Sequence, residues 1–166
     1  MQKILSQKSN VQRKKQKSFA PTFVPLEWRR LNLKLTLVGG APVALDFVES
    51  KPRRTCDVET INKWQKHLHE ALRKGGAKYV AQLSGTDFQR EVWQRIAEIP
   101  WGKTISYKEL ALSVGRPKAF RAVANACGAN PLPLFIPCHR VLGAHDLGGF
   151  SAGLELKKIL LLAEAK

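Results

Sequence analysis

Apolar and polar residues alternate in two neighbouring stretches of the first half of the chain. Every second residue from Leu31 to Leu37 is leucine, and the alternation resumes at Val43, Leu45 and Phe47. A period of two is typical of half-buried strands, and the intervening Gly39-Gly40 pair favours a turn. The sequence therefore predicts a β-hairpin.

The apolar spacing then changes to that of a helix. Four apolar residues recur at helical spacing up to Gly75-Gly76, a pair typical of a helix end. They are Ile61, Trp64, Leu68 and Leu72. The first half is therefore predicted to be a small α+β unit.

Two capping boxes predict helix starts in the second half. Thr86 and Gln89 precede an apolar face that continues to Ile99, whereas Ser106 and Glu109 open a shorter helix. In a capping box the side chain of the first residue accepts a hydrogen bond from the backbone N–H of the fourth residue. The side chain of the fourth residue accepts one from the backbone N–H of the first. Two helices are therefore expected here.

A helix-turn-helix is predicted next. The short helix closes at Gly115, and the following helix is predicted to start near Pro117 and end at Gly128. In DNA-binding examples the second helix enters a groove with its N-terminal residues nearest the bases, where Lys118 and Arg121 would lie. Helix pairs of this kind also occur in proteins that do not bind DNA. Residues 101–140 nevertheless carry six basic residues and one acid, which favours DNA.

A last helix is predicted near the end of the chain. Its apolar residues recur at helical spacing and are expected to form its buried face. They are Leu156, Ile159, Leu160 and Ala163.

Composition adds charge to this picture. The 166 residues suffice for one domain or two small ones, and the net charge of +15 favours a polyanionic partner, nucleic acid before membrane. Residues 1–20 carry six basic residues and no acid, as expected of a disordered arm that either contacts phosphates or is simply solvated. The sequence shows no apolar run of transmembrane length and no secretory signal, so an intracellular protein is expected.

Cys138 is the candidate nucleophile among three cysteines. Their spacings suggest neither a disulfide framework nor a zinc ribbon. A neighbouring base or positive charge promotes the reactive thiolate, and His139 follows Cys138 directly. The alternative for Cys138 is a structural cysteine beside an unrelated histidine. Cys56 and Cys127 have no such neighbour and are expected to be structural or surface thiols.

Residues 136–141, Ile-Pro-Cys-His-Arg-Val, resemble the active-site signature of the O6-alkylguanine-DNA alkyltransferases. The resemblance extends through residues 85–93, the Ser106-Tyr107 helix start, Arg121-Ala122-Val123, Asn130-Pro131 and the last helix. It covers residues 85–166, whereas residues 21–84 agree only in general architecture.

The resemblance implies an α+β fold of two domains after the arm at 1–20. Residues 21–84 would form a small N-terminal α/β domain of the RNase H-like type with an antiparallel sheet. Residues 85–166 would form a mainly helical domain that contains the helix-turn-helix. The implied function is direct repair of DNA, in which O6-alkylguanine, and O4-methylthymine as a further substrate, is flipped out and its alkyl group moves irreversibly to Cys138.

The resemblance also implies catalytic roles. Cys138 attacks the alkyl carbon, His139 accepts its proton through a water, and Glu164 orients His139. Tyr107 donates a hydrogen bond to the guanine, and Asn130 braces the active-site turn.

Further residues are implied on the DNA-binding surface and around the flipped base. Arg121 would fill the space that the base leaves in the duplex. The other DNA-binding residues are Tyr107, Lys118, Ala122 and Arg140, and the substrate pocket comprises Pro133, Val141, Phe150 and Ser151. Two residues depart from the family's pattern: Ala152 replaces an expected glycine, and Phe135 is larger than the usual aliphatic residue.

The implied partner is double-stranded DNA, bound through its minor groove by a monomer without metal, small-molecule cofactor or membrane. A cytoplasmic or nucleoid location is expected, or a nuclear one in a eukaryote. Two alternatives are a lesion sensor that binds alkylated bases without transfer, and a cysteine hydrolase. The presence of Cys138 disfavours the sensor, and the hydrolase would need an oxyanion hole that the sequence does not indicate.

Overall fold

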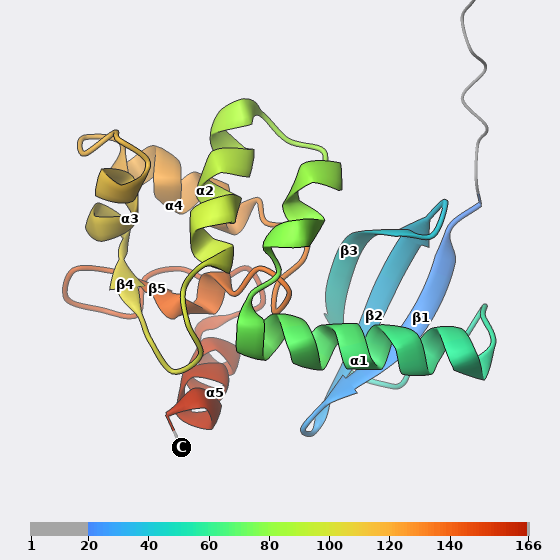
Figure 1. Cartoon of the computed structure of the whole chain (residues 1–166). Coiled ribbons are helices and arrows are strands. Elements are labelled where there is room, and N and C mark those ends of the chain that lie inside the picture. Colours follow the sequence, from blue (N-terminus) through green and yellow to red (C-terminus); the bar gives the residue numbers. More distant parts are fainter. Residues whose placement is uncertain (1–19, 166) are drawn as a thin grey trace, which may run out of the picture.

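A computed structural model describes residues 20–165 of the chain. The fold contains a three-stranded antiparallel sheet followed by a mainly helical region, so the predicted α+β class is confirmed (Figure 1). The predicted basic arm lies almost wholly outside the described residues.

The sheet has the strand order β1-β2-β3, with β1 at Thr22–Trp28, β2 at Leu31–Val38 and β3 at Ala41–Val48. The predicted hairpin is confirmed: Gly39 and Gly40 adopt φ angles of 59° and 81°, a region that glycine enters without steric cost. The sequence reading missed β1, because Pro25 interrupts its pattern. A proline is tolerated on an edge strand such as β1, where its missing N–H removes no central ladder bond.

Helix α1, Val58–Lys74, lies across the sheet (Figure 1). Its first turn is capped by Asp57, whose side chain accepts a hydrogen bond from the backbone N–H of Thr60, and it ends at Gly75 with φ 88°. A 3-10 helix, η1 at Ala77–Gln82, leads into the second half.

Four helices make up most of the second half. Both predicted capping boxes are present, at the starts of α2 and α3, although α2 ends two residues before Ile99. A short 3-10 helix η2 and a parallel pair of two-residue strands, which the sequence reading missed, complete this half. The bounds are α2 Asp87–Ala97, β4 Ile105–Ser106, α3 Tyr107–Ser113, α4 Phe120–Gly128, η2 Cys138–Arg140, β5 Val141–Leu142 and α5 Leu154–Glu164.

Helices α3 and α4 form the predicted helix pair, with Gly115 at φ 67° between them (Figure 1). The predicted start of the second helix was too early. Helix α4 begins at Phe120, and Pro117 and Lys118 form a turn before it. Lys118 is therefore exposed ahead of the helix rather than within its first turn.

The predicted buried face of α5 was partly wrong. Leu160 and Ala163 are buried, but Ile159 is 52% exposed and Leu156 is half-buried. The buried face instead includes Lys157 and Glu164, which occupy the same side at spacings of three and four from Leu160. Their polar ends have hydrogen-bond partners inside the protein, which offsets the cost of burial.

The buried apolar residues of both halves form one continuous core. Phe135 belongs to this core, where its ring lies 5.0 Å from that of Tyr79 and 6.2 Å from that of Trp64. The phenyl ring is larger than the aliphatic side chain usual at this position in the family, and its extra volume therefore fills space between the two halves of the chain. Over residues 20–165, no helix is long and apolar enough to span a membrane.

Candidate active site

Cys138 begins the 3-10 helix η2 and is 5% exposed. The turn before it is fixed by the ring of Pro137 and by a 2.8 Å hydrogen bond from the Cys138 N–H to the Ile136 carbonyl. The thiol is therefore held on a rigid turn at the edge of the core.

Asn130 braces this turn, as the resemblance implied. Its Nδ2 donates to the Ile136 carbonyl at 2.7 Å and to Cys138 Sγ at 3.2 Å, and its Oδ1 accepts from the Leu132 N–H at 3.0 Å. One buried amide thus ties both ends of the loop from 130 to 138 and gives the sulfur a hydrogen-bond donor.

The predicted hydrogen bond between His139 and Glu164 is confirmed. His139 Nε2 lies 2.8 Å from Glu164 Oε1, with both side chains buried. His139 Nδ1 is also buried and has no hydrogen-bond partner among the described residues. Nδ1 therefore forms no direct hydrogen bond to Cys138 Sγ, which leaves the path through a water that the resemblance implied.

Arg140 does not lie on the DNA-binding surface, and that prediction was wrong. Its side chain is fully buried and binds Glu164 through Nε at 2.8 Å and Nη2 at 2.9 Å. It also donates to the carbonyls of Ile99 at 2.7 Å and Leu72 at 2.8 Å. All three nitrogens of the guanidinium have a protein acceptor, so Arg140 joins α1, the segment after α2 and α5 around the site.

Lys157 is a residue of the site that the sequence reading did not single out. It is fully buried, and its Nζ donates to the carbonyls of Val141 at 2.6 Å and Gly149 at 3.1 Å. Its position three residues before Leu160, on the apolar face of α5, was the available signal. Lys157 fixes the loop that leads to Phe150.

Burial and neighbouring polar groups shift the pKa values of the three site residues in opposite directions. Burial raises the pKa of the Cys138 thiol, while the Asn130 hydrogen bond and the Lys157 charge act to lower it. Burial lowers the pKa of His139 against the opposing effect of Glu164. Burial alone would raise the pKa of Glu164, but hydrogen bonds from His139 and Arg140 lower it to about 2. The resting site therefore contains a thiol, a neutral imidazole and a carboxylate.

A pocket of about 200 Å³ opens onto Cys138. Tyr107 lines it, with its hydroxyl donating to the Gly149 carbonyl at 3.4 Å, and so do Phe150 and Ser151. Burial raises the pKa of Tyr107, so its hydroxyl remains a donor. Cys127, expected to be only structural or at the surface, also lines this pocket, and burial raises its pKa to about 12.

Two residues expected in the pocket do not line it. Pro133 is buried in the loop after α4, and Val141 is fully buried where β5 pairs with β4. The Val141 carbonyl is already an acceptor for Lys157. Ala152 is exposed and also does not line the pocket, so it does not narrow it.

The outer face of α4 presents Arg121 and Ala122 to solvent, and Lys118 is exposed in the preceding turn. The Arg121 guanidinium lies 5.8 Å from the centre of the Phe120 ring. Helix α4 also contributes Ala124, Asn125 and Gly128 to the Cys138 pocket, so the helix pair and the pocket are adjacent. Among residues 20–165, no cluster of three potential metal ligands occurs.

Fold and site together define a protein that carries a nucleophilic cysteine beside a helix-turn-helix. The family profile described as "6-O-methylguanine DNA methyltransferase, DNA binding domain" matches residues 87–166. A methylated-DNA–protein-cysteine methyltransferase from Methanosarcina barkeri is 41% identical over 130 residues, which cover 72% of this chain and 82% of the relative. The chain therefore belongs to the methylated-DNA–protein-cysteine methyltransferase family.

Two further similarities agree with this assignment. A probable methylated-DNA–protein-cysteine methyltransferase from Acanthamoeba polyphaga mimivirus is 55% identical over 85 residues, which span 51% of this chain and 57% of that relative. The crystal structure of OGT from Mycobacterium tuberculosis in complex with DNA superposes with a TM-score of 0.69. It is 32% identical and covers 86% of this chain and 92% of that one.

Proposed function

We propose that this protein repairs O6-alkylguanine in duplex DNA by transferring the alkyl group to Cys138, in a single turnover. The observation that carries the proposal is the buried His139–Glu164 pair beside a cysteine that opens onto a pocket. Family membership and the DNA complex of the Mycobacterium tuberculosis relative support DNA as the partner.

The proton path follows from the hydrogen bonds. An ionised Glu164 can only accept, so His139 Nε2 carries the hydrogen of their bond. The lone pair of His139 Nδ1 is then free to take the thiol proton of Cys138 through one water. Asn130 and Lys157 stabilise the thiolate that results, through a hydrogen bond and a nearby positive charge.

The transfer step is a displacement at the alkyl carbon. The bond from Sγ to carbon forms while the bond from carbon to O6 breaks, and its electron pair remains on the guanine. The Tyr107 hydroxyl is placed at the pocket to donate a proton or hydrogen bond to this anion. The product is a thioether that water does not cleave, so each protein acts once.

The base must leave the duplex to reach the pocket, because O6 of guanine is otherwise held within the stack. We assign Arg121 to the space vacated by the base and the exposed face of α4 to the minor groove. O4-methylthymine would fit the same chemistry. The protein would act as a monomer wherever the cellular DNA lies, in a nucleoid or a nucleus.

Methyl transfer to the protein tests the proposal directly. Duplex DNA with a labelled O6-methylguanine should lose one label per wild-type molecule, and mass spectrometry should locate the label on Cys138. Cys138→Ser should accept none while still binding the duplex, and Cys56→Ser, outside the pocket, is the matched control that should retain transfer. Repeated turnover would refute the single-use mechanism, and tight lesion binding without transfer would favour the sensor.

A further inference from the structure

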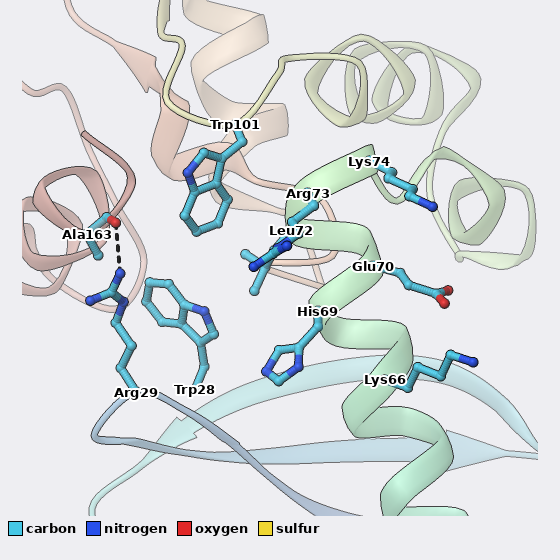
Figure 2. A pocket seen from close by; sticks show the side chains of 10 residues that line it. All are labelled: Trp28, Arg29, Lys66, His69, Glu70, Leu72, Arg73, Lys74, Trp101 and Ala163. Carbon is cyan, nitrogen blue, oxygen red and sulfur yellow. Dashed lines mark hydrogen bonds between the residues drawn. The ribbon is translucent and has the colours of Figure 1, made fainter. Parts of the chain in front are cut away.

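A second hollow, of about 1000 Å³, opens between α1 and the loops that follow β1 and α2, and it shares no lining residue with the Cys138 pocket. Its apolar part includes the indole rings of Trp28 and Trp101, whose centres lie 6.5 Å apart in an edge-to-face arrangement. Figure 2 shows both rings and His69 at the space between α1 and the Arg29 turn. Trp28 is buried, whereas Trp101 is half-buried and His69 is exposed, so the latter two rings supply aromatic surface in a concave site.

The border of this hollow is basic. Arg29, Lys66, Arg73 and Lys74 line it, with Glu70 as the acid among its lining residues. Glu70 lies 4.0 Å from Lys78, which partly offsets its charge. Aromatic rings inside a cationic border are suited to a ligand that combines flat rings with negative charges.

The basic border continues into the loop before α1. A neighbouring hollow of about 630 Å³ shares Arg29 and His69 with the first and adds Lys51 and Arg54. Its acid Glu27 is bound by Lys51 at 2.6 Å. Because α1 has 17 residues, the two hollows follow a helix about 25 Å long. This length suits several linked charged units better than one small anion.

Arg29 is held in place at the junction of the two hollows. Its φ angle of 55° is unusual for a residue with a side chain. Its Nη2 donates to the Ala163 carbonyl at 2.9 Å, and its guanidinium lies 5.4 Å from the centre of the Trp28 ring (Figure 2). The junction is therefore preorganised with a positive charge directly beside an aromatic ring.

We propose that these two hollows form one groove that binds a single strand of nucleic acid. Bases would stack at Trp101 and His69, and phosphates would pair with the basic residues along α1. A duplex would not fit this chemistry, because its base faces are covered by their neighbours. The groove thus gives the protein a second nucleic-acid site apart from the helix pair.

The positive charge of the border disfavours two other occupants of the groove, the N-terminal segment and a second copy of the chain. The segment 1–19 carries six basic residues and no acid, so it would be repelled by the border. A second copy of the chain would also present a predominantly basic protein, since 28 lysines and arginines outnumber 13 acids. A nucleic-acid strand supplies both the negative charge and the rings.

Competition binding with the full-length protein tests the second site. A fluorescent oligothymidine should bind with undiminished affinity when unlabelled, undamaged duplex saturates the helix pair. Arg73→Gln should weaken binding of the strand several-fold. The slope of log affinity against log salt concentration should fall by about 0.7, as expected for the loss of one phosphate contact. Arg95→Gln is the matched control, since Arg95 is an exposed arginine in the last turn of α2 and lines neither hollow. Equal strand affinity in the two variants would overturn the proposal.

Crosslinking locates the strand independently of any variant. A strand containing 5-iodouracil should crosslink on irradiation to peptides that contain Trp28, His69 or Trp101. Crosslinks confined to residues 107–128, or displacement of the strand by duplex, would place it on the helix pair and overturn the groove. Methyl transfer from a short duplex should be equal in wild type and Arg73→Gln. Failure of transfer in both would count against the proposed repair function alone, because strand binding is read separately.

Discussion

At the scale of single residues, the site depends on a buried carboxylate that accepts hydrogen bonds from His139, from Arg140 and from the backbone N–H of Gly102. Glu164 accepts from His139 through Oε1 and from Arg140 through both oxygens. The ion pair with Arg140 keeps Glu164 ionised, and the ionised carboxylate sets the tautomer of His139. Arg140 is therefore a positioning residue that acts through Glu164.

Glu164→Gln should slow alkyl transfer on the order of 100-fold, since the proton acceptor loses its orienting carboxylate. Duplex affinity should change by less than about twofold, because Glu164 is buried and the duplex contacts are expected at α4. Single-turnover transfer and duplex titration measure the two effects, under conditions where circular dichroism shows a folded variant. Glu155→Gln, an exposed change on the same helix, is the control. Unchanged transfer in Glu164→Gln would refute the relay.

Glu164 should also make stability depend on pH in acid. Its folded pKa of about 2 lies below the ordinary value of 4.5, so its contribution is complete above pH 4.5 and is lost as the pH falls toward 2. Urea unfolding across this range should record the loss. A carbon-13 NMR titration of the Glu164 carboxyl should give a midpoint near 2, whereas a midpoint near 4.5 would mean that His139 and Arg140 do not hold the ionised form.

At the scale of elements, the helix pair and the active-site turn are joined through α4. The Trp93 indole of α2 donates to the Ala126 carbonyl of α4 at 2.8 Å, while the opposite side of α4 exposes Arg121. Four residues of α4 also line the Cys138 pocket. A duplex docked on α4 would therefore lie beside the opening through which a flipped base must pass.

Arg121→Ala should reduce repair of a duplex lesion by about tenfold or more, because the gap left by the flipped base loses its filler. Base flipping, followed by a fluorescent base analogue opposite the lesion, should fall in parallel. Arg95→Ala, an exposed arginine of α2, should leave both measurements unchanged. If Arg121→Ala repaired the lesion at the wild-type rate, α4 would not be the recognition helix.

At the scale of the whole molecule, excess positive charge should govern how strongly DNA binding depends on salt. The net charge of +15 includes six basic residues within the first twenty positions. Contacts of such residues with phosphates release counterions whatever the base sequence, so they add affinity without selectivity.

Replacing Lys3, Lys8 and Lys14 with glutamine should weaken binding to all duplexes roughly equally. The salt slope should fall by about 0.9 for each lysine that contacts a phosphate. Binding isotherms from 50 to 200 mM salt measure this, with Lys34, Lys63 and Lys158 replaced together as a control of equal charge. A selective loss for lesion-bearing duplex would mean that the arm takes part in recognition.

The sequence by itself determined the features that depend on neighbouring residues. The capping boxes at Thr86 and Ser106, the glycine turn at Gly39-Gly40 and the adjacency of Cys138 and His139 in the chain are all set within a few positions. Their geometry depends on hydrogen bonds and steric freedom of the local backbone, so a pattern of residue types suffices to predict them. The signature around Cys138 also led to the family, and through it to Glu164 and Asn130.

Only the tertiary structure decided which charged residues are buried. The resemblance implied Arg140 as a DNA contact, yet carbonyls of Leu72 and Ile99 and the carboxylate of Glu164 meet around it. Lys157 is buried for a similar reason, since the carbonyls of Val141 and Gly149, outside its own helix, converge on its ammonium. Burial of a charge depends on acceptors that lie far away in the chain, and packing alone brings them together.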